Sequence, residues 1–277
     1  MRTTMTSNRL GETFHGLKAR GRTGVIPFVT VGFPNVATTM ELVPALARAG
    51  ADVIELGVPF SDPLADGATI QKASFEALRQ GVTLKGCLEV CKKLRDGGFK
   101  TPLVLMGYYN PILALGLETF VAAAQRSGVD GTIVADLPTE ESGPLRQMCS
   151  GGGIDLICLL APTSTDQRVA AACATASGFI YCVSLTGVTG ARAEVSPEVA
   201  HLVERVRACS GLPVAVGFGL SRREHVEAVG KYADAVVVGS ALVNVIENAP
   251  RGEAIERASR FVADLAGAPR SSVRGMV

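Results

Sequence analysis

Short apolar segments rich in Val, Ile and Leu recur along this chain of 277 residues, and each is followed by a longer segment of mixed character. The short segments are apolar throughout instead of alternating with polar residues, which is typical of parallel strands covered on both faces. The strands expected from them are 25–31, 52–57, 103–107, 132–135, 156–160, 179–183, 214–218 and 235–238.

The longer segments place apolar residues three or four positions apart, as one face of a helix does. Clear examples are 38–49, 84–95, 117–127, 165–176 and 197–209. Repeated strand-then-helix units predict one α/β domain over 1–277, a single (β/α)8 TIM barrel, and an open doubly wound sheet is the alternative. An extra N-terminal helix at about 8–20 should close the barrel bottom, a short extra helix at 241–246 should precede the last helix, and the tail at about 268–277 should fray.

One local pattern appears three times, as AGADVIELGVP, SGVDGTIVADLP and KYADAVVVGSA. Each copy runs from a small residue through an Asp into an apolar strand and out into a Gly, Pro or Ser loop. The similarity is weak, but it suits copies of one structural unit arranged around a barrel.

Charge and composition narrow the class of partner. The net charge is +1, from 27 basic and 26 acidic residues, and the basic residues form no stripe interleaved with aromatics. This pattern argues against a nucleic-acid or anionic-membrane surface. The N-terminus lacks the apolar core of a signal peptide and no apolar run is long enough to span a bilayer, so a cytoplasmic location is expected.

The seven cysteines are scattered through apolar segments without a CxxC pair, and no histidines stand at metal-ligand spacing. They predict buried free thiols in a reducing compartment, with no metal site.

The run ELGVPFSDPLADG carries a carboxylate where a buried strand should end. If Ile54 and Leu56 pack outward against helices, Glu55 points into the barrel mouth, where loss of water raises the pKa of its carboxyl group. Asp66 follows on the next loop, and the strand ends of a barrel are where functional groups gather. The alternative is that Glu55 closes the strand at a solvent edge and that the aspartates are ordinary turn residues.

Glycines mark the opposite side of the predicted mouth. One strand ends in Gly217-Phe218-Gly219, and the next ends in Gly239-Ser240 at the start of a short helix. Backbone N–H groups and a helix N-terminus at such loops suit a phosphate, although plain turns are the alternative. The glycine- and threonine-rich segment around Thr189 suggests a mobile loop that closes over the site, or an ordinary connection.

The histidines, His15, His201 and His225, fall in helical segments away from this mouth. No hydrolase triad is therefore supported.

These motifs together resemble the alpha subunit of tryptophan synthase, over about 14–266. The resemblance rests on PFVTVGFP, ELGVPFSDPLADGATIQ, MGYYNP, VADLPTEES, SLTGVTG, GFGLS and VVGSALV. It implies a (β/α)8 barrel that cleaves indole-3-glycerol phosphate into indole and glyceraldehyde 3-phosphate. It also implies an alpha2beta2 heterotetramer with a beta subunit that carries pyridoxal phosphate and receives the indole, and no cofactor or metal on this chain.

Carried over residue by residue, the resemblance assigns a role to each matching position. Glu55 becomes the general acid/base, and Asp66 the carboxylate that accepts the indole N–H. The remaining positions are the phosphate contacts Gly190, Phe218, Gly219, Gly239 and Ser240, the indole-site neighbours Phe28, Ile70, Met106 and Tyr181, the mobile-loop residue Thr189, and the partner-interface residues Asp62, Pro63 and Asn110. Ala68 and Leu185 stand where some members have Pro and Arg, which affects loop dynamics and subunit coupling more than chemistry.

Three other functions stay open on the sequence. The chain could be a stand-alone lyase that releases indole freely, or a catalytically silent activator of a beta subunit. Other barrel enzymes acting on sugar phosphates share the phosphate loops but lack the ELGVPFSDPLADG arrangement.

Overall fold

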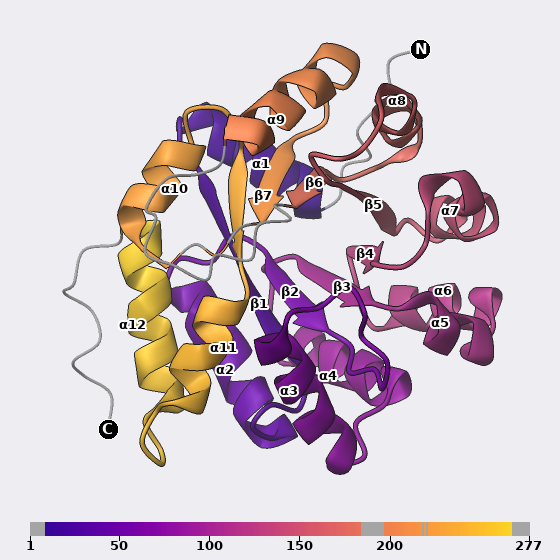
Figure 1. The fold of residues 1–277 in the computed structure, drawn as a ribbon. Helices are drawn as coiled ribbons and strands as arrows, with labels where there is room; N and C mark the ends of the chain where they lie inside the picture. Colours follow the sequence, from indigo (N-terminus) through magenta and orange to yellow (C-terminus); the bar gives the residue numbers. More distant parts are fainter. Residues whose placement is uncertain (1–8, 184–196, 218, 220, 268–277) are drawn as a thin grey trace.

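A computed structural model describes residues 9–183, 197–217, 219 and 221–267. Eight parallel strands form a closed barrel in chain order, with β8 paired back to β1 (Figure 1). The strands are β1 (Gly24–Thr30), β2 (Ile54–Gly57), β3 (Leu103–Gly107), β4 (Gly131–Val134), β5 (Asp155–Leu160), β6 (Ile180–Val183), β7 (Val214–Gly217) and β8 (Ala235–Val238). The predicted strands and the closed TIM barrel are confirmed, and the open sheet is excluded.

Helices surround the barrel (Figure 1). Those of the described ranges are α1 (Arg9–Ala19), α2 (Val36–Arg48), α3 (Ala68–Arg79), α4 (Leu84–Asp96), α5 (Tyr109–Leu115), α6 (Leu117–Arg126), α7 (Gly143–Gly151), α8 (Asp166–Thr175), α9 (Pro197–Cys209), α10 (Arg223–Val229), α11 (Ser240–Glu247) and α12 (Ala254–Ala266), with a 3₁₀ turn η1 (Thr139–Glu141). The short helix before the last one is confirmed as α11. The tail at 268–277 lies outside the described residues.

The N-terminal helix closes the bottom of the barrel, as the sequence predicts. Leu10, Phe14 and Leu17 of α1 pack into the cluster of side chains that fills the barrel interior. The ring of Phe14 lies 5.5 Å from that of Phe179, just before β6. The barrel interior is therefore packed from below, and the opposite end, where the strands end, is the place at which barrels of this kind bind their ligands.

Alternation along β2 separates its two faces. Ile54 and Leu56 belong to the cluster between the strands and the outer helices, whereas Val53 belongs to the interior cluster. Glu55 shares the inward face with Val53 because successive side chains of a strand point to opposite sides. The predicted inward direction of Glu55 is confirmed.

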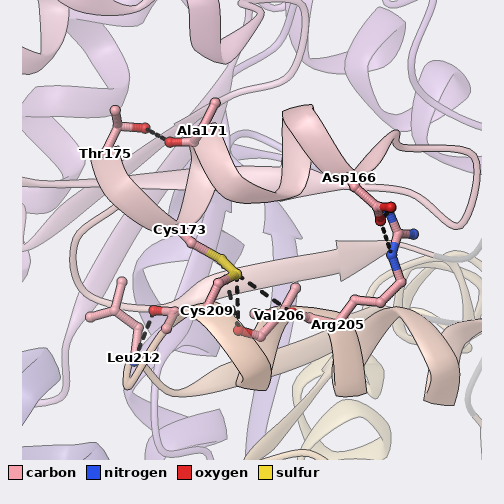
Figure 2. The surroundings of a disulfide bond; sticks show 9 residues. Asp166, Ala171, Cys173, Thr175, Arg205, Val206, Cys209 and Leu212 are labelled. Carbon is pink, nitrogen blue, oxygen red and sulfur yellow. Dashed lines mark hydrogen bonds and ion pairs between the residues drawn. A yellow bond between two sulfur atoms is a disulfide. The ribbon is translucent and has the colours of Figure 1, made fainter.

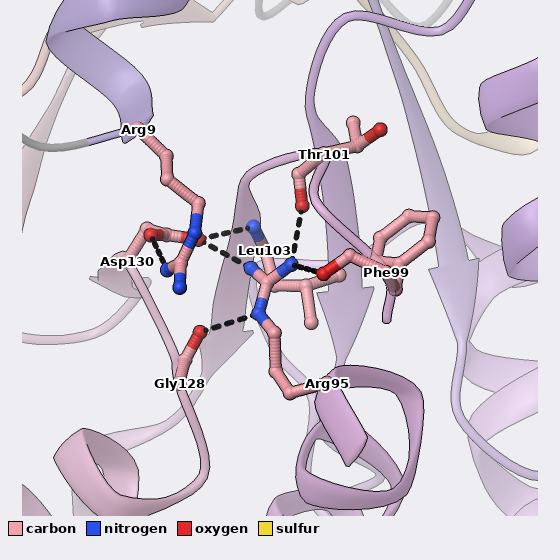
Figure 3. Close-up of polar contacts among 7 residues, drawn as sticks. All are labelled: Arg9, Arg95, Phe99, Thr101, Leu103, Gly128 and Asp130. Carbon is pink, nitrogen blue, oxygen red and sulfur yellow. Dashed lines mark hydrogen bonds and ion pairs between the residues drawn. The ribbon is translucent and has the colours of Figure 1, made fainter. Parts of the chain in front are cut away.

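The aspartate that recurs in the three copies of the local sequence pattern has a structural role. Asp52, Asp130 and Asp234 each accept a hydrogen bond from the backbone N–H of the first or second residue of a neighbouring strand, at 2.8 to 2.9 Å. Each also pairs with an arginine. Asp130 binds both Arg9 and Arg95 at 2.6 Å, which ties α1 and α4 to the start of β3 (Figure 3).

The cysteine prediction needs a correction. Cys173 of α8 and Cys209 of α9 form a disulfide, with their Cα atoms 6.1 Å apart (Figure 2). They lie on adjacent outer helices and are less buried than the other five cysteines, which are buried free thiols as expected. Sequence spacing hides this pair because the two helices lie on either side of β6.

None of the helices in the described ranges combines the length and the apolar character that a bilayer crossing requires.

Candidate active site

The carboxyl group of Glu55 is buried at the mouth end of the barrel. The residue is 1% exposed, and neither carboxyl oxygen has a hydrogen-bond partner among the described residues. Burial, and secondarily the charge of Asp66, raises the pKa of Glu55 to about 8. A buried carboxyl group without a partner is costly to keep, so it indicates a functional role rather than a structural one.

Asp66 stands on the loop between β2 and α3, where the side chain of Tyr108, the residue just after β3, meets it. The Tyr108 hydroxyl donates to Asp66 Oδ2 at 3.0 Å and accepts from the backbone N–H of Ala65 at 3.1 Å. Burial raises the pKa of Asp66, and the hydrogen bond from Tyr108 lowers it. The charge of Asp66 acts on Glu55, so the structure brings the two predicted acids together.

Apolar side chains wall a hollow beside Asp66. Phe28, Ile70 and Met106, three of the predicted indole-site residues, line it together with Asp66 and Tyr108. The fourth, Tyr181, lies on β6, and burial followed by the charges of Glu55 and Asp66 raises its pKa well above the usual range. Apolar walls beside one carboxylate match the chemistry of a flat apolar ring that carries one N–H group.

Two glycines make room for aromatic rings: that of Phe28, which lines this hollow, and that of Tyr181 on β6. A Cβ atom on Gly57 would lie 2.3 Å from Cζ of Phe28, and one on Gly217 would lie 2.4 Å from the Tyr181 hydroxyl oxygen. Both distances are far below van der Waals contact. The packing of the Tyr181 ring therefore explains why residue 217 is a glycine, whereas the sequence suggested only a loop residue.

The predicted phosphate contacts are placed only in part. Gly239 precedes α11, whose first residue is Ser240, and a Cβ atom on Gly239 would lie 3.7 Å from Cβ of Phe28. The N-terminus of α11 thus opens beside the apolar hollow, and its free N–H groups and dipole favour an anion there. A Cβ atom on Gly219 would meet none of the described residues within 4 Å, its chain neighbours left aside. Gly190, Thr189 and Phe218 lie outside the described residues.

Of the predicted partner-interface residues, Asp62 and Pro63 lie on the loop after β2, whereas Asn110, expected on a loop, lies in the first turn of α5. Asp62 and Asn110 are exposed and Pro63 is partly so. Two apolar side chains accompany them: Leu64 is 92% exposed and Leu113 on α5 is 50% exposed. Large exposed apolar side chains beside a site are typical of a surface that meets another protein.

A second hollow opens between η1 and the ends of β4 and β5, lined by residues that include Asp136, Cys158 and Arg168. Its charged rim is an exposed ion pair between Arg168 and Glu140. It contains neither predicted acid, so the hollow beside Asp66 is the better candidate.

The histidines lie in the helices α1, α9 and α10, as expected. His225 nevertheless reaches the loop after β7, because its Nδ1 atom accepts a hydrogen bond from the backbone N–H of Ser221 at 3.4 Å. In the described ranges, no three His, Cys, Asp or Glu side chains gather in a way that could hold a metal ion.

The sequence prediction missed two polar side chains of this site. Tyr108 stands in the quoted MGYYNP motif but received no role, although it follows Val104 and Met106 at the two-residue spacing of the inward face. Thr30 ends β1 two residues after Phe28, and its buried hydroxyl has no partner among the described residues. That spacing was the available signal in both cases.

Comparison with known proteins gives one consistent result. A sequence model of the family described as tryptophan synthase alpha chain matches residues 14–268. The tryptophan synthase alpha chain of Roseiflexus sp. (strain RS-1) is 51% identical over 260 residues, which cover 94% of this chain and 100% of that relative.

Solved structures agree with the sequence relatives. Tryptophan synthase subunit alpha from Legionella pneumophila str. Paris is similar with a TM-score of 0.87 at 34% identity, covering 95% of this chain and 98% of that one. A chain from the tryptophan synthase a2b2 complex of Pyrococcus furiosus is similar with a TM-score of 0.83 at 42% identity, covering 88% and 98%.

Proposed function

Because the chain belongs to the tryptophan synthase alpha chain family, we infer that Glu55 and Asp66 are the two carboxyl groups with which it cleaves indole-3-glycerol phosphate. The products are indole and glyceraldehyde 3-phosphate. The observation that carries this assignment is the buried Glu55 carboxyl group, which has no partner among the described residues and is acted on by the charge of Asp66.

The raised pKa of Glu55 suits the order of proton transfers. With a pKa of about 8, Glu55 is mostly protonated at neutral pH and begins as an acid. It gives its proton to C3 of the indole ring, which becomes a cation. As the carboxylate it then takes the proton of the neighbouring side-chain hydroxyl, while the C–C bond breaks and its electrons return to the ring. Glu55 recovers its proton, so one group serves both transfers.

Asp66 acts on the charge that this protonation creates. Protonating C3 places positive charge on the indole nitrogen, and an ionised carboxylate that accepts the N–H stabilises it as it develops. The Tyr108 hydroxyl favours the ionised form of Asp66, against the effect of burial. The two carboxyl groups therefore need different protonation states. Burial raises the pKa of both, and at Asp66 the hydrogen bond from Tyr108 opposes that rise.

We propose that the phosphate binds at the N-terminus of α11, through Gly239 and Ser240, with Gly190, Phe218 and Gly219 completing the site. Such an anchor would present the reacting carbon to Glu55 at small entropic cost. Phe28, Ile70, Met106 and Tyr181 would hold the indole ring, and the segment around Thr189 would close over it.

The partner is a tryptophan synthase beta subunit in an alpha2beta2 heterotetramer. The Pyrococcus furiosus relative is described in such a complex. Asp62, Pro63 and Asn110 are the proposed contacts, supported by the exposed Leu64 and Leu113 nearby in the chain. We propose that pyridoxal phosphate stays on the beta subunit and that this chain carries no cofactor. We also propose a cytoplasmic location: five of the seven cysteines are free thiols, and the Cys173–Cys209 disulfide is the exception.

Indole release from indole-3-glycerol phosphate tests the assignment, measured with and without a beta subunit. Glu55→Gln should lose nearly all turnover and Asp66→Asn most of it, while Glu41→Gln, an exposed site on α2, should match the wild type. A Glu55→Gln variant that keeps a tenth of the wild-type rate would overturn the role of Glu55. Wild-type chain that makes no indole under either condition would favour the silent activator, and full activity without the partner would favour the stand-alone lyase.

A further inference from the structure

We infer that Tyr108 is a positioning residue of the reaction: its hydroxyl holds the Asp66 carboxylate, and the loop that carries it, where the indole N–H is received. The inference rests on the proposed role of Asp66. Tyr108 itself touches neither the bond that breaks nor the proton that moves.

One hydroxyl group fixes two consecutive residues of the loop. It donates to Asp66 Oδ2 at 3.0 Å and accepts from the backbone N–H of Ala65 at 3.1 Å. The first bond sets the direction of the carboxylate, and the second sets the backbone from which it projects. Both capacities of the hydroxyl are used, so the Tyr108 oxygen acts as a fixed point between them.

The ring of Tyr108 holds the other end of the same loop. It stacks on Phe60, with ring centroids 4.9 Å apart and planes at 28°. The backbone N–H of Phe60 in turn donates to Ser74 Oγ of α3 at 2.9 Å. One side chain therefore contacts both ends of the segment between β2 and Asp66.

Tyr108 is well supported itself. It is 5% exposed and follows β3 directly, so the barrel fixes its backbone. It also lines the hollow with Phe28, Ile70 and Met106, which places its contact with Asp66 at the edge of the proposed indole site. The Asp66 carboxylate, although it lies on a loop, is thereby held in place as firmly as a strand residue. Catalysis requires such fixed positions of its charged groups.

The charges around Asp66 show why the hydroxyl matters for its protonation state. Glu55 on β2 and Tyr181 on β6 share the buried mouth with Asp66, and Asp136 after β4 acts on Tyr108. Burial raises the pKa of Asp66, and the Tyr108 hydrogen bond lowers it. The pKa of Tyr108 is itself raised far above its usual range, so the hydroxyl keeps the proton that it donates. Without that hydroxyl, Asp66 takes up a proton at a higher pH.

Tyr108→Phe tests the inference because it keeps the ring on Phe60 and removes the hydroxyl alone. The kcat/KM for indole-3-glycerol phosphate at pH 7 should fall roughly tenfold, and the acid limb of its pH profile should move upward by about one pH unit. Most of the loss should appear in kcat, with KM changed less than threefold. Tyr109→Phe, one residue along the chain, should leave rate and profile unchanged.

A double-mutant cycle separates this inference from the proposed function. On an Asp66→Asn background, Tyr108→Phe should cause no further loss, because the group that it positions is already gone. An Asp66→Asn variant with normal turnover would overturn the role of Asp66 itself. If Asp66→Asn is impaired but Tyr108→Phe keeps the wild-type acid limb, or if the two losses multiply, the positioning role is wrong. Thermal unfolding midpoints of the four proteins show whether each variant is folded.

Discussion

Replacing Glu55 by Gln should stabilise the protein while it abolishes turnover. The pKa of Glu55 is raised from an ordinary 4.5 to about 8, chiefly by burial. The unfolded chain therefore releases this proton at a lower pH than the folded chain does. Stability that is fully present below pH 4.5 is lost as the pH rises towards 8, because ionisation favours the unfolded state throughout that window. Gln is neutral at every pH and avoids the loss.

The size of the effect follows from the same pKa. At roughly 1.4 kcal/mol per pH unit, the loss amounts to about 3 kcal/mol at pH 7 and roughly 5 kcal/mol above pH 9. The buried Gln amide and the protonated carboxyl are both neutral and equally short of partners, so the variant should gain most of this difference. For 277 residues the unfolding entropy is about 0.6 kcal/mol/K, so the midpoint at pH 7 should rise by about 5 °C.

Thermal unfolding of the wild type and of Glu55→Gln, measured between pH 4 and pH 9, checks this reasoning. The two midpoints should coincide near pH 4 and separate steadily up to about pH 8. Glu41→Gln changes the same chemical group at an exposed position and should give no such separation. A Glu55→Gln midpoint at pH 8 equal to or below the wild type would refute the claim that desolvation of Glu55 opposes folding.

Two further substitutions test the packing that supports the site. Gly57→Ala should cost about 1 to 3 kcal/mol of stability and raise the KM for indole-3-glycerol phosphate about tenfold or more, since its methyl group would displace the Phe28 ring. Asp130→Ala should cost about 3 to 5 kcal/mol of stability by denaturant unfolding. It leaves the Arg95 guanidinium, whose side chain is 11% exposed, without its charged partner. Turnover per folded molecule should persist.

Matched controls accompany both. Gly143→Ala, where a Cβ atom meets nothing within 4 Å, should leave stability and KM close to the wild type. Asp166→Ala removes an exposed partner of Arg205 (Figure 2) and should cost about 1 kcal/mol or less. Equal losses at Asp130 and Asp166, or an unchanged KM in Gly57→Ala, would contradict the two arguments.

The fold was predictable because local and global signals agree. Continuous apolar runs at regular spacing allow few arrangements other than a closed parallel barrel, and the strand ends were predicted to within two residues. The Asp of the three-fold pattern was visible, but its role was not, because the N–H that it binds belongs to a different strand. The Cys173–Cys209 pair escaped for the same reason: contacts between outer helices depend on spacing around the barrel, which no local pattern encodes.

The same distinction, between local pattern and contact with another element, decides which parts of the candidate site could be predicted. The face on which Glu55 lies follows from the two-residue period of a strand, so its direction could be deduced. The position of Asp66 could not, because a loop has no period and Asp66 takes its direction from Tyr108, 42 residues further on. The packing roles of Gly57 and Gly217 could not be predicted either, because each glycine makes room for an aromatic ring on a neighbouring strand.

In this barrel the chemistry of the site depends on the packing of the core below it. The inward side begins with Val53, just before β2, and continues with Glu55 and Gly57 of the strand. These are a core residue, a buried acid and a glycine that leaves room for the Phe28 ring. The packing that fills the lower layer removes water from the Glu55 carboxyl one step above it, and that burial is the larger cause of its raised pKa. Loosening the lower layer, even far from any substrate, should therefore lower the pKa of Glu55 and weaken it as an acid at neutral pH. Substitutions of the interior cluster should move the pH profile as well as the stability, whereas equally destabilising changes between the strands and the outer helices should move stability alone.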